Sequence, residues 1–263
     1  MLSSLTFSPY LMLLLFSALL VVAKLKMDCL KSVAIHCNNI TKSYGASEAK
    51  IQALRGIDLD VYYGELLILA GPSGCGKTSL ISICAGLLDA DEGECLILGQ
   101  NLKKMTKNEQ AHFRGSSIGF VFQAFNLIPS LNILENVALP LLINGTARSE
   151  ALDRALAMLE TVEIKNRADA FPPQLSGGQQ QRAAIARALI HEPKIIFCDE
   201  PTSNLDHQTG THVMQYLQNA AQKPNRAIIV VTHDPRIFSF ADRIAYMDDG
   251  KIVNITEREE GVQ

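Results

Sequence analysis

The sequence predicts an α/β domain into which a block of helices is inserted. Two continuous apolar runs, Lys194–Cys198 and Ala227–Val231, are typical of central strands in a parallel sheet, which are buried on both faces. Between Asn132 and Ile190 the apolar residues instead recur at helical spacing. We therefore expect a core sheet whose sequence is interrupted by roughly 60 to 70 residues of mainly helical structure.

The other elements follow from local patterns. Alternating apolar residues or short apolar runs predict strands at Val33–Cys37, Ile57–Val61, Glu65–Ala70, Cys95–Leu98 and Ile118–Phe122. Helical spacing predicts helices at Thr78–Leu87, Leu131–Leu142, Ser149–Val162 and Gly178–Ile190. A last hairpin, Ile244–Met247 with Lys251–Asn254, is expected around the Asp249–Gly250 turn.

Composition excludes several classes of protein. With 48% hydrophobic and 19% charged residues the chain is not disordered, and it can bury the core of one large domain. A net charge of −3 gives no overall basic field, so no nucleic-acid partner is expected. The six cysteines form no C-x-x-C pair and no zinc-type spacing, so we expect reduced thiols in a cytosolic protein. They are Cys29, Cys37, Cys75, Cys84, Cys95 and Cys198.

The N-terminal segment leaves two alternatives open. Leu2–Ala23 carries no charge, and a bilayer-spanning helix needs about 20 mostly apolar residues. Lys24, Lys26 and Lys31 follow it, which for a membrane anchor would place the N-terminus outside. A cleaved signal peptide is disfavoured, because no basic region precedes the apolar run. The second alternative, which we favour, is that Met27 is the true start and residues 1–26 are an upstream extension.

A phosphate-binding loop is the strongest motif. The segment fits G-x-x-x-x-G-K-[ST] between a predicted strand and a predicted helix, as that motif requires, and consists of Gly71, Pro72, Ser73, Gly74, Cys75, Gly76, Lys77 and Thr78, with Ser79 next. Its glycines let successive backbone N–H groups turn toward phosphate. Lys77 would supply a positive charge to the β- and γ-phosphates, and the Thr78 hydroxyl would bind Mg²⁺. The sequence therefore predicts a nucleoside triphosphatase.

Two acids follow the apolar run that ends at Cys198. Asp199 and Glu200 would lie at the carboxyl end of a buried strand, where open α/β sheets bind ligands. Asp199 is a candidate Mg²⁺ ligand, and Glu200 is a candidate for orienting and polarising the attacking water. An apolar run followed by two acids is weak evidence for a catalytic site on its own. Together with the phosphate-binding loop it becomes strong evidence.

A third motif indicates which class of nucleoside triphosphatase this is. Leu175–Arg182 reads Leu-Ser-Gly-Gly-Gln-Gln-Gln-Arg and resembles the signature sequence of ABC ATPases. Ser176, Gly177 and Gly178 stand at a predicted helix start, which favours anions, and Ser176 with Gln179 also fits a capping box. The resemblance covers about residues 33–253. It implies a P-loop NTPase core with a mixed sheet, an α-helical subdomain at about 124–190 and an N-terminal antiparallel β part, within a domain spanning 33–255.

The resemblance also implies roles for single residues. Tyr44 matches the aromatic residue that stacks on adenine, Gln123 the glutamine that touches Mg²⁺ or water, and His233 the histidine that senses the γ-phosphate. The segment Ser203–Asp206 matches the loop that crosses the dimer interface. The expected catalytic residues are thus Lys77, Gln123, Glu200 and His233, and the expected metal ligands are Thr78, Gln123 and Asp199. The expected nucleotide contacts are Tyr44, residues 71–79, Ser176, Gly177, Gly178, Gln179 and Asp206.

The family resemblance implies ATP and Mg²⁺ as cofactors and a homodimer. Each ATP would lie between the Lys77 loop of one copy and the Ser176 loop of the other. The segment Phe122–Val137 further resembles the lipoprotein-releasing, macrolide-exporter and cell-division branch of ABC subunits. That branch implies a separate membrane permease, often continuing to a periplasmic adaptor, and a peripheral place at the cytoplasmic face of the inner (plasma) membrane.

Two functions fit this resemblance. The first is an ATPase that powers export or extraction of a lipoprotein, lipid or drug-like substrate. The alternative is a non-transporting ATPase that moves a membrane partner mechanically, as in cell division. A soluble ABC ATPase of DNA repair or translation is disfavoured, because the chain carries neither a long coiled-coil insertion nor a second cassette.

Overall fold

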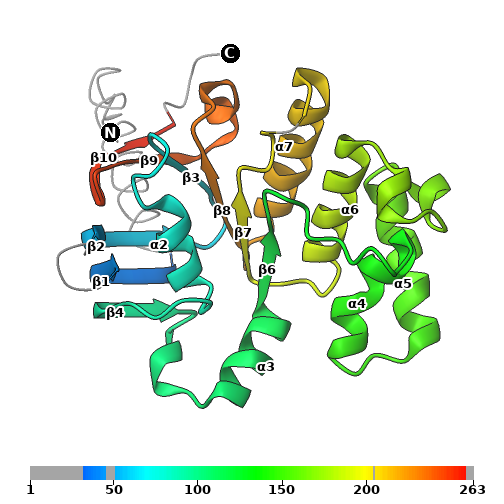
Figure 1. Ribbon diagram of the computed structural model, residues 1–263, viewed down its shortest axis with the longest axis horizontal. Coiled ribbons are helices and arrows are strands. Elements are labelled where there is room, and N and C mark those ends of the chain that lie inside the picture. Colours follow the sequence, from blue (N-terminus) through cyan, green and yellow to red (C-terminus); the bar gives the residue numbers. More distant parts are fainter. Residues whose placement is uncertain (1–31, 46–50, 204, 259–263) are drawn as a thin grey trace, which may run out of the picture. The chain divides into compact units, whose positions relative to one another are not determined.

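The computed structural model describes residues 32–45, 51–203 and 205–258 (Figure 1). The apolar segment 2–23, for which a membrane anchor was one alternative, lies outside these residues, and so does Asn204. Across the described ranges, no helix has both the length and the apolarity that crossing a bilayer requires.

A six-stranded mixed sheet forms the centre of the described domain. Its order is β10 (Lys251–Glu257), β9 (Arg243–Asp248), β3 (Leu66–Ala70), β8 (Ala227–Thr232), β7 (Ile195–Asp199) and β6 (Ile118–Val121). Neighbours are parallel except β10, which pairs antiparallel with β9 across the predicted Asp249–Gly250 turn. All residues of β3 and β8 are buried, which explains their continuous apolar sequences. The predicted mixed sheet is confirmed.

A second sheet is antiparallel and confirms the expected N-terminal β part. Its order is β2 (Ile51–Tyr62), β1 (Val33–Tyr44), β4 (Glu92–Ile97) and β5 (Gln100–Asn101). Strands β1 and β2 run further than predicted. The more polar end of β1 still pairs with β2, as Lys42 does with Leu54, although its side chains are only partly buried.

Alternate residues of the central strands face two different layers. Leu67, Phe197 and Ile229 pack in one core with α2 (Lys77–Cys84) and the antiparallel sheet. Leu66, Ile196 and Val230 belong to a second core with α6 (Gly177–Leu189) and α7 (His207–Ala221). The helices α2 and α6 therefore cover opposite faces of the central sheet (Figure 1).

The inserted helices have a hydrophobic core of their own. This lobe contains α4 (Ile133–Ile143), α5 (Arg148–Thr161), the short 3₁₀ turns η3 (Lys165–Arg167) and η4 (Pro172–Gln174), and α6. Val137, Ala155, Leu159 and Ala186 are fully buried within it. The lobe thus has a hydrophobic cluster made by the helices themselves, although α6 also packs against the central sheet.

Some helical elements differ from the sequence-based expectations. Helix α3 (Lys107–Ser117) and the 3₁₀ turns η2 (Leu102–Lys104) and η5 (Pro235–Phe240) were not predicted. Helix α2 ends at Cys84, three residues short of the predicted Leu87. Gly86 follows with a φ of 65°, a left-handed conformation that terminates helices.

The register of the parallel strands brings four segments to one edge of the sheet. Ala70 pairs with Thr232, Asp199 with Val231, and Val121 with Cys198. Strands β3, β6, β7 and β8 thus end at nearly the same level. The residues that follow them include the phosphate-binding loop, Gln123, Glu200 and His233, all at the edge where open α/β sheets bind ligands.

Candidate nucleotide-binding site

The loop 71–76 connects β3 to α2 and depends on glycine at its two ends. A Cβ on Gly71 would lie 2.1 Å from the carbonyl oxygen of Met247, and one on Gly76 would lie 2.4 Å from that of Ala53. Gly76 is also the N-cap of α2, with a left-handed φ of 101°. Any side chain at these positions would push the loop away from its neighbours, so the tight turn requires glycine.

Lys77 directs its ammonium group back over this loop. The side chain is buried, and its Nζ donates hydrogen bonds of 2.8 Å each to the carbonyl oxygens of Gly71 and Pro72. Ser73 and Gly74 at the crest of the loop are exposed. The loop therefore presents backbone groups, a helix start and one fixed positive charge to the same space, a combination that suits a polyphosphate.

Thr78, in the first turn of α2, contacts Asp199, the last residue of β7. The Thr78 Oγ1 donates to the two carboxylate oxygens of Asp199 at 3.2 and 3.4 Å. Burial raises the pKa of Asp199, and the charge of Glu200 adds to the rise, while the Thr78 hydrogen bond and Lys77 oppose it. A hydroxyl and a carboxylate in contact offer the hard oxygen ligands that Mg²⁺ prefers, so these residues fit that ion.

Glu200 and His233 form a second polar pair beside the first. The Nδ1 of His233 lies 2.7 Å from Oε1 of Glu200. Only 12% of the Glu200 side chain is exposed, against 57% for His233. Glu200 has a left-handed φ of 49°, rare for a residue with a side chain, and its backbone N–H donates to the Val231 carbonyl at 2.9 Å. This backbone strain occurs where the carboxylate turns to meet His233.

Tyr44 is the last residue of β1, and its side chain contacts the first turn of α2. Its hydroxyl is 3.1 Å from the Ser79 hydroxyl, and 44% of the residue is exposed. The structure thus brings an exposed aromatic residue next to the phosphate-binding loop from a position far away in the sequence.

Gln123 lies in the segment that joins β6 to the helical lobe, and its side chain is exposed. Arg187 of α6 holds the following residues, donating to the carbonyl oxygens of Phe125 at 2.8 Å and Asn126 at 2.6 Å. Both residues have positive φ angles, of 59° and 50°. Arg187 was not predicted as a site residue, because an arginine inside a helix gives no sign of which carbonyl groups it will reach.

The signature motif begins α6. Ser176 is exposed and is the N-cap, accepting a hydrogen bond from the Gln179 backbone, while the Gln179 side chain accepts one from the Ser176 backbone. A Cβ on Gly178 would lie 2.7 Å from Cγ2 of Thr209. Asp206 caps the neighbouring helix α7 by accepting from Thr209. The predicted capping box is present, and the exposed helix start leaves N–H groups open to a ligand.

One chain does not bring all predicted residues together. The structure places Tyr44, residues 71–79, Asp199, Glu200 and His233 around the carboxyl edge of the central sheet. Ser176 instead begins a helix of the opposite layer. The two helix starts therefore belong to helices that cover different faces of the central sheet.

Comparison with known proteins places this site in a family. Residues 54–203 match the family model described as ABC transporter. An uncharacterized ABC transporter ATP-binding protein of Methanocaldococcus jannaschii is 45% identical over 85% of this chain and 100% of that protein. The lipoprotein-releasing system ATP-binding protein LolD of Pseudoalteromonas translucida is 39% identical over 85% of this chain and 96% of its own.

A solved structure agrees with these matches. The ATP-binding cassette MJ0796, from Methanocaldococcus jannaschii, was determined as a dimer in a post-hydrolysis state bound to ADP and Pi. Its chain superimposes with a TM-score of 0.80 at 40% identity, covering 85% of this chain and 98% of that chain. The chain described here belongs to the ABC transporter family and is an ATP-binding subunit with ATPase activity.

Proposed function

We propose that the loop 71–78 binds the phosphates of ATP, with Lys77 against the β- and γ-phosphates and Tyr44 against the adenine. The proposal is supported by the position of Lys77 over the loop and by the contact of Tyr44 with Ser79. Thr78 and Asp199, together with Gln123, would hold Mg²⁺. The bound ion would neutralise charge that develops on the phosphate oxygens.

Glu200 is the proposed base for the attacking water, and the observation that carries this role is its 2.7 Å contact with His233. A carboxylate oriented by a neighbouring imidazole at the edge of the phosphate site can accept a proton from water. His233 is mostly exposed, so its ring is free to contact the γ-phosphate while its Nδ1 orients Glu200.

The test is Glu200→Gln, which keeps the shape of the side chain and removes its basicity. We expect ATP to bind normally and the turnover of ATP to fall about 10²- to 10⁴-fold. Glu192→Gln is a matched control, because Glu192 also has a left-handed φ, of 53°, but precedes β7 at the opposite edge of the sheet. Unchanged ATP hydrolysis in Glu200→Gln, measured as phosphate release, would remove Glu200 from this role.

The subunit is further proposed to act as a homodimer in which the Ser176–Gln179 helix start of one copy closes the ATP site of the other. The support is the opposite-layer position of α6 and the dimeric state of the similar cassette MJ0796. The segment Ser203–Asp206, at the start of α7, would lie at this interface. ATP would then hold the two copies together, and hydrolysis would release them.

For the whole machine, we propose export or extraction of a lipoprotein, lipid or drug-like substrate. The ATPase would sit at the cytoplasmic face of the inner membrane, on a separate permease that continues to a periplasmic adaptor. The supporting observations are the resemblance of Phe122–Val137 to this branch and the LolD relative. Reconstitution with a candidate permease in liposomes tests it: substrate should stimulate ATP hydrolysis. A rate that ignores substrate but responds to a membrane partner would favour mechanical regulation.

A further inference from the structure

Three cysteines from three different elements meet in the layer between the two sheets. Cys37 lies on β1, Cys95 lies opposite it on β4, and Cys84 is the last residue of α2. Their sulfur atoms are separated by 3.6 Å (Cys37–Cys84), 3.5 Å (Cys37–Cys95) and 3.9 Å (Cys84–Cys95). The sequence spacing gave no sign of this cluster, because only the folded β1–β4 pair and α2 bring the thiols together.

These separations suit a metal ion. Three sulfurs bound to one ion at the Zn–S length of about 2.3 Å with tetrahedral angles would lie about 3.8 Å apart. The thiols would therefore need to move by only a few tenths of an ångström to share an ion. A thiol that fills an apolar core looks different, as Cys198 shows: it is fully buried among aliphatic side chains of the second core, without a thiol in its cluster.

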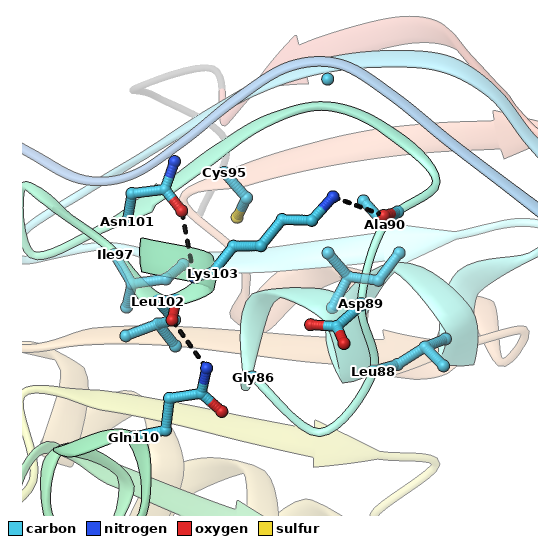
Figure 2. Close-up of a pocket in the computed structure, with 12 residues that line it drawn as sticks. Gly86, Leu88, Asp89, Ala90, Cys95, Ile97, Asn101, Leu102, Lys103 and Gln110 are labelled. Atoms are coloured by element: carbon cyan, nitrogen blue, oxygen red, sulfur yellow. Dashed lines mark hydrogen bonds between the residues drawn. The ribbon is translucent and has the colours of Figure 1, made fainter. Parts of the chain in front are cut away.

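A small cavity gives the cluster access to solvent. Cys95 is half-buried and lines a cavity of about 40 Å³ together with Gly86, Ala90, Asn101 and Lys103 (Figure 2). That volume exceeds what one water molecule requires, so an ion can enter and a water can complete its coordination. Cys37 and Cys84 are buried behind Cys95 and complete the site from the core side.

The three thiols are hydrogen-bonded to one another. Hydrogen bonds with Cys37 and Cys84 lower the pKa of Cys95 to about 5, while hydrogen bonds with Cys37 and Cys95 and burial raise the pKa of Cys84. Sulfur ligands favour soft, thiophilic metal ions over hard ones such as Mg²⁺.

We propose that Cys37, Cys84 and Cys95 bind one thiophilic metal ion, of the Cu(I) or Zn(II) class, with a water from the cavity as an additional ligand. On binding, each thiol that still carries a proton releases it to solvent and forms a metal–sulfur bond, with no change of oxidation state. This site is separate from the Thr78–Asp199 pair, whose oxygen ligands suit Mg²⁺ instead.

The site has a consequence for the nucleotide, which rests on the proposed function. Helix α2 begins at Lys77 and ends at Cys84, and β1 carries both Cys37 and Tyr44. A bound ion would therefore fix the far end of the phosphate-binding helix to the strand that carries the adenine-contacting residue. Loading of the ion should change the affinity for ATP by limiting the relative motion of these elements.

The test uses the full chain, kept reduced and free of oxygen, and needs no nucleotide. Cd(II) serves as the probe, because its thiolate complexes have an ultraviolet charge-transfer band. We expect the band to saturate at one equivalent, native mass spectrometry to show one ion per chain, and Cu(I) and Zn(II) to displace Cd(II). A band that never saturates at one equivalent, or a chain that gains no ion, would overturn the proposal.

Cys95→Ser is the informative variant, because Cys95 is only half-buried and its loss should leave the fold intact by circular dichroism. It should bind Cd(II) at least about tenfold more weakly. Changing a residue that only contacts a metal ligand already lowers metal affinity by about 10- to 100-fold, and Cys95 would be a ligand itself. The control Cys198→Ala should bind as the unchanged chain does. Equal binding by Cys95→Ser, or an equal loss in Cys198→Ala, contradicts the assignment. Failure of ATP hydrolysis would leave this binding result untouched, so the two proposals fail separately.

Discussion

Asp199 holds its carboxyl group where ionisation is unfavourable. Burial and the neighbouring Glu200 charge raise its pKa above the ordinary value of 3.8. The folded chain therefore binds a proton here more tightly than the unfolded chain does, so stability falls as the pH rises from 3.8 through the raised pKa. At pH values above the raised pKa the ionised Asp199 lowers the stability of the fold. Residues retained for function commonly have such a cost.

Asp199→Asn should thus stabilise the nucleotide-free protein at neutral pH, because a neutral amide replaces a poorly solvated carboxylate. The gain should shrink as the pH falls below 3.8, where the carboxyl of the unchanged chain is neutral in both states. Thermal unfolding followed across this pH range measures the difference. Exposed Asp153→Asn is the control and should show no gain. A less stable Asp199→Asn variant would contradict the view that the buried charge of Asp199 destabilises the fold. The same variant should lose Mg²⁺-dependent ATP binding.

For single residues, the sequence predicted which residues belong to the site better than it predicted which of them are in contact. The motif 71–78 and the acids 199–200 could be found as strings, because their chemistry requires residues that are adjacent in the chain. The Glu200–His233 contact joins residues 33 positions apart and depends on the parallel pairing of β7 with β8. The cysteine cluster joins two strands of the antiparallel sheet and one helix, so no local pattern could have indicated it.

Among the elements, helix α6 carries functional contacts at both of its ends. Its first turn carries the signature motif, and its last turn carries Arg187, whose two hydrogen bonds hold the Phe125–Asn126 backbone next to Gln123. Burial lowers the pKa of Arg187, yet the guanidinium stays charged, so its bonds to carbonyl oxygens are of the stronger, charge-assisted type. A shift of α6 would therefore move the segment that leads from β6 into the helical lobe.

Arg187→Ala should lower the free energy of unfolding by about 2 to 4 kcal/mol, because two carbonyl groups in strained conformations lose a charged donor. Amide hydrogen exchange in residues 123–128 should also become faster. Arg148→Ala is the matched control: Arg148 pairs with Glu135 at the surface, at 2.9 Å and with 66% of the arginine side chain exposed. That loss should stay within about 1 kcal/mol. Equal effects of the two changes would show that the Arg187 contacts contribute no special stability.

Most elements with a buried face were predictable, although α7, which buries Val213, Met214 and Leu217, was not among the predicted ranges. The apolar runs of β7 and β8 and the helical spacing of α5 gave their positions to within a few residues. Helix α3 was missed because its side chains are mostly exposed and only Gln110 is buried, so no apolar period marks it. Its start nevertheless carried a readable signal, the capping box of Thr106 with Glu109.

For the whole molecule, the two layers of the central sheet separate the Lys77 loop from Ser176. Symmetry then determines what a pair of chains contains, because a two-fold dimer repeats every contact between residue i and residue j. In the proposed dimer each of the two ATP sites takes its Lys77 from one copy and its Ser176 from the other. A substitution at either position therefore damages both sites of a pure dimer.

Combining two inactive proteins should consequently restore activity. When Lys77→Ala is mixed with Ser176→Arg, one site of each hybrid dimer collects both defects and the other collects none. About a quarter of all sites should be intact if the chains associate at random in equal amounts, since half of the dimers are hybrids. Phosphate release that exceeds the sum of the separate proteins measures this rescue. A mixture no more active than its components would mean that each chain builds its catalytic centre alone.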